Sequence, residues 1–73
     1  MHDFVLHYYQ DHVMVIALTR KAHQWLKNYF KDDKIESIYK VPIDRILIMK
    51  SRLAIEGMIL EETRDETYNS EEL

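Results

Sequence analysis

The stretch FVLHYYQDHVMVIAL, residues 4–18, decides the fold of this chain. It is rich in Val, Ile, Phe and Tyr, which are enriched in strands. Gln10 and Asp11 form its only polar break. We therefore predict a β-hairpin with strands Phe4–Tyr9 and His12–Leu18, joined by Gln10 and Asp11 as a two-residue loop.

Both faces of the predicted hairpin are apolar. A two-residue loop places Tyr9 opposite His12, and successive side chains alternate between the two faces. The first face consists of Phe4, Leu6, Tyr8, Val13, Val15 and Ala17. The second face consists of Val5, His7, Tyr9, His12, Met14, Ile16 and Leu18. We assign the first face to the core. Because the second is too apolar for ordinary exposure, we expect a further element or another chain to cover it.

A helix is expected directly after the hairpin. Thr19 is a favourable N-cap, and TRKAHQWLKNYFKDD follows it as residues 19–33. The apolar residues of this segment recur at the three-and-four spacing of one buried stripe: Ala22, Trp25, Leu26, Tyr29 and Phe30. This is the strongest periodicity in the chain, and it predicts an amphipathic helix packed on the hairpin.

Residues 35–60 predict a further strand and a second helix. Ile35–Val41 is a candidate third strand, and Pro42 suits the first turn of a helix that runs to about Glu56 and stops at Gly57. Ile48 and Ile55 fall outside the main apolar face of that helix, which favours an interface over burial on all sides. Met58–Leu60 is either a short strand or a continuation of the helix, because one glycine does not end a helix by itself.

The composition indicates one small soluble domain. The 73 residues are 47% apolar and contain no cysteine, so neither disulfides nor thiolate ligands can support the core. A chain of this length gives a thin core, and a homodimer would relieve the shortage. The longest apolar run, Val13–Leu18, is far shorter than the roughly 20 residues of a membrane span. With no recognisable targeting segment, we predict a cytoplasmic protein without membrane association.

The charges are divided unevenly along the chain. Residues 1–60 hold nine Lys or Arg against seven Asp or Glu, whereas residues 61–73 hold six acids against Arg64 alone. The acidic strip contains too little apolar surface to offset its ordering entropy. We therefore divide the chain into an α+β domain, residues 1–60, and an acidic tail, residues 61–73, that we expect to be mobile.

Few residues suggest catalysis or metal binding. His7 and His12 lie diagonally on the second face of the hairpin, where they could hold a metal ion or exchange a proton. Their spacing matches no established ligand pattern, and we interpret them as interface or edge histidines satisfied by a backbone carbonyl or by water. The paired carboxylates lie in predicted loops or the tail, where nothing shifts their pKa values. We predict a protein that is not an enzyme and uses neither a cofactor nor a metal.

A basic stripe on the first helix offers a nucleic-acid surface. Arg20, Lys27 and Lys31 share one helix face and could follow a phosphate backbone. Trp25 and its aromatic neighbours fall on the buried stripe, so no exposed rings alternate with these cations. Nucleic-acid binding is therefore the alternative hypothesis.

The preferred hypothesis is an α+β protein-binding module, with the hairpin and a candidate third strand packed against two helices. We expect it to regulate or inhibit a larger protein assembly, and to form a homodimer. The predicted partner-binding residues combine exposed apolar side chains with carboxylates of the tail: Tyr9, Met14, Ile48, Ile55, Glu61, Glu62, Asp65 and Glu66.

Overall fold

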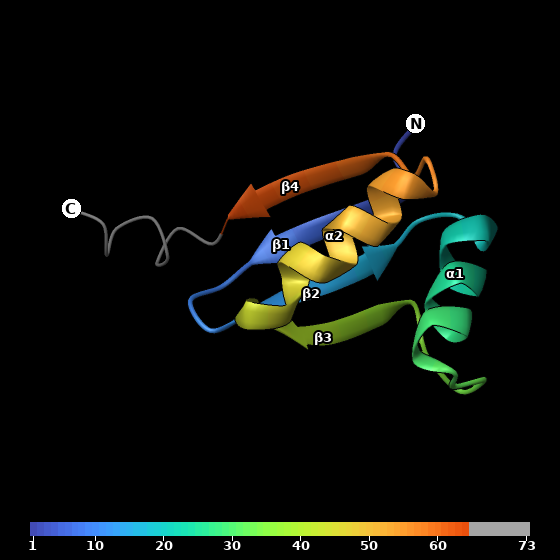
Figure 1. Cartoon of the computed structure of the whole chain (residues 1–73), viewed down its shortest axis with the longest axis horizontal. Coiled ribbons are helices and arrows are strands. Elements are labelled where there is room, and N and C mark those ends of the chain that lie inside the picture. The colour runs from blue at the N-terminus through green and yellow to red at the C-terminus, as the bar shows by residue number, and fades with distance from the viewer. Residues whose placement is uncertain (65–73) are drawn as a thin grey trace.

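The computed structural model describes residues 1–64 (Figure 1). These residues form the predicted α+β fold with two helices, and its sheet has four strands, one more than the hairpin and the candidate third strand. Its elements are β1 (Phe4–Tyr8), β2 (His12–Ala17), α1 (Arg20–Phe30), β3 (Ile38–Pro42), a 3₁₀ turn (Ile43–Arg45), α2 (Ile46–Ile55) and β4 (Leu60–Arg64). The strands form one sheet in the order β3-β2-β1-β4. Two of the predicted partner-binding residues, Asp65 and Glu66, lie outside the described residues.

The hairpin has the predicted register. Phe4 pairs with Ala17, and Tyr8 pairs with Val13. The Tyr9 N–H donates to the carbonyl of His12 at 2.9 Å, which places Gln10 and Asp11 at the turn. Because the register is the predicted one, the division of side chains between the two faces is confirmed as well.

α1 begins and ends as its capping residues dictate. The Thr19 hydroxyl accepts a hydrogen bond from the Ala22 N–H at 3.0 Å. Lys31 takes the left-handed conformation, with φ of 55°, and its N–H donates to the Lys27 carbonyl. Ala22 and Leu26 are fully buried, so the predicted apolar stripe faces the core.

The strand after α1 lies later in the chain than predicted. β3 begins at Ile38, because Ile35 is buried in the connecting loop, where the ring of His23 contacts its carbonyl oxygen at 2.9 Å. Pro42 ends this strand with φ of −57° and ψ of 145°, and α2 begins at Ile46 after the 3₁₀ turn. The predicted helix start at Pro42 is therefore wrong. Proline is tolerated in the strand because β3 lies at an edge of the sheet.

The segment after α2 turns back into the sheet. Gly57 has φ of 77°, a conformation that favours glycine, and the Met58 N–H donates to the Leu53 carbonyl at 3.0 Å. β4 then runs parallel to β1. The open choice for Met58–Leu60 is thereby settled: the helix stops, and a strand begins at Leu60. This strand includes residues 61–64, which the sequence pattern assigns to the tail.

Asp3 joins the starts of β1 and β4. Its carboxylate accepts the Ile59 N–H at 3.0 Å and the Thr19 hydroxyl at 3.1 Å, while its own N–H donates to the Ile59 carbonyl. The hydrogen bond from Ile59 is the main cause that lowers the pKa of this carboxyl below its ordinary value. One side chain thus connects β1, β4 and the N-cap of α1.

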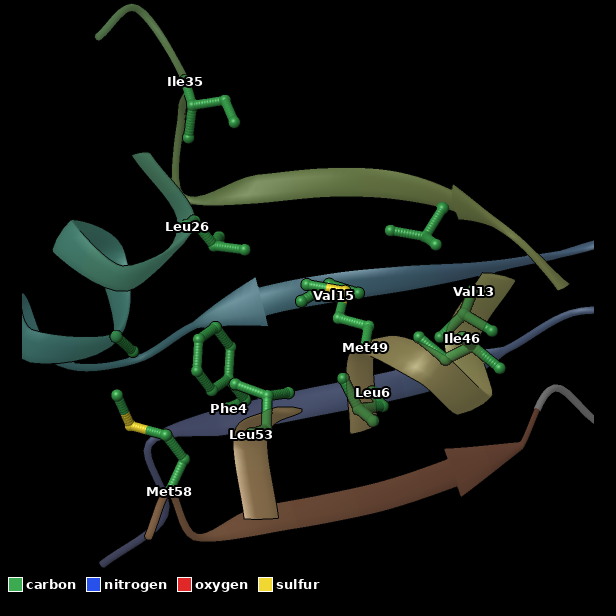
Figure 2. Close-up of a cluster of buried hydrophobic side chains, with 12 residues drawn as sticks. Phe4, Leu6, Val13, Val15, Leu26, Ile35, Ile46, Met49, Leu53 and Met58 are labelled. Atoms are coloured by element: carbon green, nitrogen blue, oxygen red, sulfur yellow. The ribbon is translucent and has the colours of Figure 1, made fainter. Parts of the chain in front are cut away.

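Both helices contribute to the core on one face of the sheet (Figures 1 and 2). Figure 2 shows Met49 and Leu53 of α2 beside Leu6 and Phe4 of β1. The fully buried side chains of the sheet all belong to the predicted core face: Phe4, Leu6, Val13 and Val15. Neither helix packs on the second face of the hairpin.

Candidate protein-contact surface

The sheet has one face that no described helix covers, and we call it the open face. Pairing of β1 with β2 and β4, and of β2 with β3, aligns the side chains that point away from the helices. The open face consists of Val5, His7, Tyr9, His12, Met14, Ile16, Leu18, Ile38, Lys40, Pro42, Glu61 and Thr63. It continues the second face of the hairpin onto both edge strands.

The centre of the open face is apolar. Val5 pairs with Ile16, which in turn pairs with Ile38, so three branched side chains lie in one row across β1, β2 and β3. Met14 lies in the next row, between His7 and Lys40. Ile38 is 51% exposed, although it is one of the larger apolar side chains. Such a row is typical of a sheet face that is covered in the functional state.

One end of the open face carries three rings in contact, of which two are stacked. The Tyr9 ring lies 4.9 Å from the His7 ring and 4.6 Å from the His12 ring, nearly parallel to the latter. His7 Nδ1 lies 2.7 Å from the Thr63 hydroxyl, and His12 Nδ1 lies 2.7 Å from an Asp11 carboxylate oxygen. The hydrogen bond with His12 is also the main cause that lowers the pKa of Asp11. Both imidazoles therefore contact polar side chains, whereas the partner predicted from the sequence is a backbone carbonyl or water.

The charged residues of the open face lie at its rim. Lys40 is on the β3 edge strand and Glu61 is on the β4 edge strand, and both are exposed. Two strands separate them, so their backbones are about 14 Å apart at the usual strand spacing. Glu61 lies 3.4 Å from the His2 ring. A basic group and an acidic group thus stand at opposite edges of an apolar surface.

The predicted apolar contact residues do not form one surface. Tyr9 and Met14 belong to the open face, whereas Ile48 and Ile55 lie on α2, which packs on the other face of the sheet. Ile48 is 65% exposed and Ile55 is 78% exposed, and Leu47 beside them is 71% exposed. The molecule therefore has two separate apolar areas, on opposite sides of the sheet.

The two predicted glutamates of β4 also point to opposite sides of the sheet. Glu61 pairs with Val5 on the open face, while Glu62 pairs with Leu6 on the helix side. Glu62 accepts the Tyr8 hydroxyl at 2.7 Å and the Lys50 ammonium at 2.8 Å. Lys50, followed by Tyr8, lowers the pKa of Glu62, so the expectation that nothing shifts the pKa values of the paired carboxylates is wrong for this residue. The cluster of Glu62, Tyr8 and Lys50 lines a groove of about 560 Å³ between α2 and β4. Its hydrogen bonds connect these two elements.

The basic stripe on α1 has no exposed rings between its charges. Arg20 and Lys31 are exposed and Lys27 is half-buried. The Trp25 and Tyr29 rings stack at 4.7 Å, and both pack against the core. The geometry therefore adds nothing to the nucleic-acid hypothesis beyond the positive charge itself.

Comparisons with known proteins identify no relative. No family model, no curated protein and no solved structure matches this chain. Among residues 1–64, no helix has both the length and the apolar character needed to cross a membrane. The same residues contain no group of three or more histidines, aspartates and glutamates placed to hold a metal ion.

The extent of the open face could be only partly predicted from the sequence. Alternation along the hairpin indicates its central residues, but Ile38, Lys40 and Glu61 join it through pairing of distant segments. The signal available for β3 was its own alternation, which sets Ile38 and Lys40 on one side of the strand. No comparable signal marks β4, because its residues are mostly polar.

Proposed function

We propose that this chain is a non-enzymatic protein-binding module that regulates or inhibits a larger protein assembly, and that the open face of its sheet is a protein-contact surface. The proposal rests on the observation that the two helices pack on one face of the sheet, while no described element packs on the other. The uncovered row of Val5, Ile16 and Ile38 has the composition of a buried surface.

The arrangement of the open face supports a contact with protein. Its centre is apolar and its charged residues, Lys40 and Glu61, stand at the rim, as in protein–protein interfaces. The rings of Tyr9 and its histidine neighbours add aromatic surface at one end, and tyrosine is enriched at the core of such interfaces. A solvated sheet face would instead carry polar residues in alternation with the core.

The remaining features support contact over catalysis. The imidazoles of His7 and His12 are engaged with Thr63 and Asp11, and the Glu62 carboxylate is engaged with Tyr8 and Lys50. These contacts hold strands, turns and helices together.

Site-specific photo-crosslinking in the native host cell tests the proposal. A benzophenone amino acid is placed at position 38 on the open face, and at position 34 in the exposed loop as a control. We expect a discrete protein adduct from position 38 that disappears when Met14→Lys is added, and no such adduct from position 34. The absence of any adduct from position 38, in a chain shown to be folded, would contradict the proposal. An adduct with a second copy and an adduct with another protein both support the open face as a protein-contact surface, and only the latter supports a role in a larger assembly.

A further inference from the structure

We propose that the partner on the open face is a second copy of this chain, packed sheet on sheet about a two-fold axis parallel to the strands. The inference rests on the proposed function of the open face and identifies the binding partner of that surface. Aligned packing of two sheets, about 10 Å apart, is a common way to cover an apolar sheet face.

The two-fold arrangement matches the β1 and β2 parts of the apolar centre to each other. Rotation about an axis that runs between β1 and β2 places β1 of one copy over β2 of the other. Val5 then faces Ile16 of the second copy, and Ile16 faces Val5 of the second copy. His7 and Met14 are exchanged in the same way in the next row. A two-fold interface requires this self-complementarity, in which residue i contacts j and j contacts i.

The same rotation matches the charges at the rim. It places β3 of each copy over β4 of the other, because these strands are the two edges of the sheet. Glu61 of the second copy then faces Ile38, and Lys40 lies one row further along the same strand. The long side chain of Lys40 can reach that carboxylate, and the symmetry forms this ion pair twice. Within one copy the two residues are too far apart to pair. An axis perpendicular to the strands would instead place β3 over β3 and would lose both ion pairs.

The edges of the sheet favour packing through the face over edge-to-edge pairing. β3 carries Lys40 and Pro42 at its edge, and β4 carries Glu61, Glu62 and Arg64. Charged residues and proline on edge strands disfavour the addition of another strand. The apolar surface of the sheet therefore lies on its open face and not along its edges.

The size of the open face predicts a weak dimer. The four strands have five or six residues each. At about 4.8 Å between strands and about 3.3 Å per residue, the flat area of the face is roughly 320–380 Å² per copy. Stable complexes bury about 800 Å² per partner, so this interface stands at the small end of the range. We expect a dimer that dissociates on dilution.

Exchange of the rim charges tests this arrangement. Sedimentation velocity over a wide range of concentrations compares the wild-type chain with Lys40→Glu and with Glu61→Lys, each of which creates two like-charge contacts. We expect each variant to dimerise roughly tenfold or more weakly than wild type. Lys34→Glu and Glu56→Lys, exposed charges outside the open face, are the matched controls and should retain wild-type dimerisation.

Mixing the two variants gives the sharper result. In a mixed dimer, the K40E copy has acidic side chains at both rim positions and the E61K copy has lysines at both. Both contacts of the mixed dimer therefore join a lysine to a glutamate again. One contact keeps the wild-type residues, and in the other the two charges are exchanged. The equimolar mixture should associate as wild type does. Failure of the mixture to associate, when wild type dimerises, would overturn the arrangement.

The oligomeric state of the wild-type chain separates this inference from the proposed function. A chain that stays monomeric at the highest concentration would overturn the second copy as occupant. If position 38 then crosslinks to another protein, the proposed function stands without the dimer. If it crosslinks to nothing, both proposals fail.

Discussion

Val5 and Ile16 face each other across β1 and β2 on the open side of the sheet, while the next pair, Leu6 and Val15, is fully buried on the other side. Neighbouring positions of one hairpin thus have the same chemistry and opposite surroundings. A substitution at one position should affect association, and the same kind of substitution one residue away should affect folding.

Threonine substitutions separate these two effects. Ile16→Thr keeps a β-branched residue in the strand, so we expect monomer stability to change by less than about 1 kcal/mol while dimerisation weakens. Val15→Thr places a hydroxyl in the core at a fully buried position. We expect it to lower the free energy of unfolding by about 1–3 kcal/mol. Urea unfolding at low concentration and sedimentation at high concentration measure the two quantities, and equal effects of both variants would contradict the assignment of faces.

Leu53 is one of the three buried side chains through which α2 packs on the sheet. It is fully buried beside Phe4 (Figure 2), so Leu53→Ala should cost about 2–5 kcal/mol of folding free energy. Because small domains are only marginally stable, we expect this variant to be largely unfolded by far-UV circular dichroism. Ala54→Ser, on the exposed side of the same helix, is the control and should stay folded.

The Glu62 contacts with Lys50 and Tyr8 predict a small pH-dependent contribution to stability. The pKa of Glu62 is lowered below its ordinary value of 4.5, so the stabilisation is present above that value and is lost as pH falls through the lowered pKa. Because 43% of the Glu62 side chain is exposed, solvent limits its contribution to about 0.5 kcal/mol. Glu62→Gln should therefore be slightly less stable than wild type at neutral pH, and the difference should shrink in acid. A difference that grows in acid would contradict this account, and Glu36→Gln serves as the control.

Asp3 should control the attachment of β4. Asp3→Ala removes the acceptor for the Ile59 N–H and the Thr19 hydroxyl, so we expect a lower unfolding midpoint and faster hydrogen exchange in β4 than in β3. Asp3→Asn retains one acceptor oxygen and should have a smaller effect. Uniform exchange rates across both edge strands would show that β4 is held mainly by its pairing with β1.

Local patterns predicted the elements whose signals are contained within one segment. The hairpin follows from the alternation between Phe4 and Leu18, and α1 follows from the N-cap at Thr19 and the spacing of its apolar stripe. β4 was missed because Glu61, Glu62 and Arg64 resemble an acidic tail, and only pairing with distant β1 makes them a strand. The strand propensity of a segment does not indicate such long-range contacts.

The candidate surface was predicted in part for the same reason. Tyr9 and Met14 were placed on an apolar face that needs cover, and the structure leaves that face open. Ile48 and Ile55 were expected to join them, but the position of α2 on the other face of the sheet separates the pairs. The sequence could indicate that each segment has excess apolar surface. It could not indicate that the two surfaces point in opposite directions.

Comparison of Ile38→Glu with Ile48→Glu is the measurement that tests the central claim most directly. Both residues are more than half exposed, on the open face and on α2 respectively, so both variants should fold as wild type does, as circular dichroism can verify. Sedimentation of the two variants then identifies the contact surface. We predict that Ile38→Glu abolishes dimerisation and Ile48→Glu preserves it, whereas the reverse result would place the contact on α2 and contradict the role of the open face.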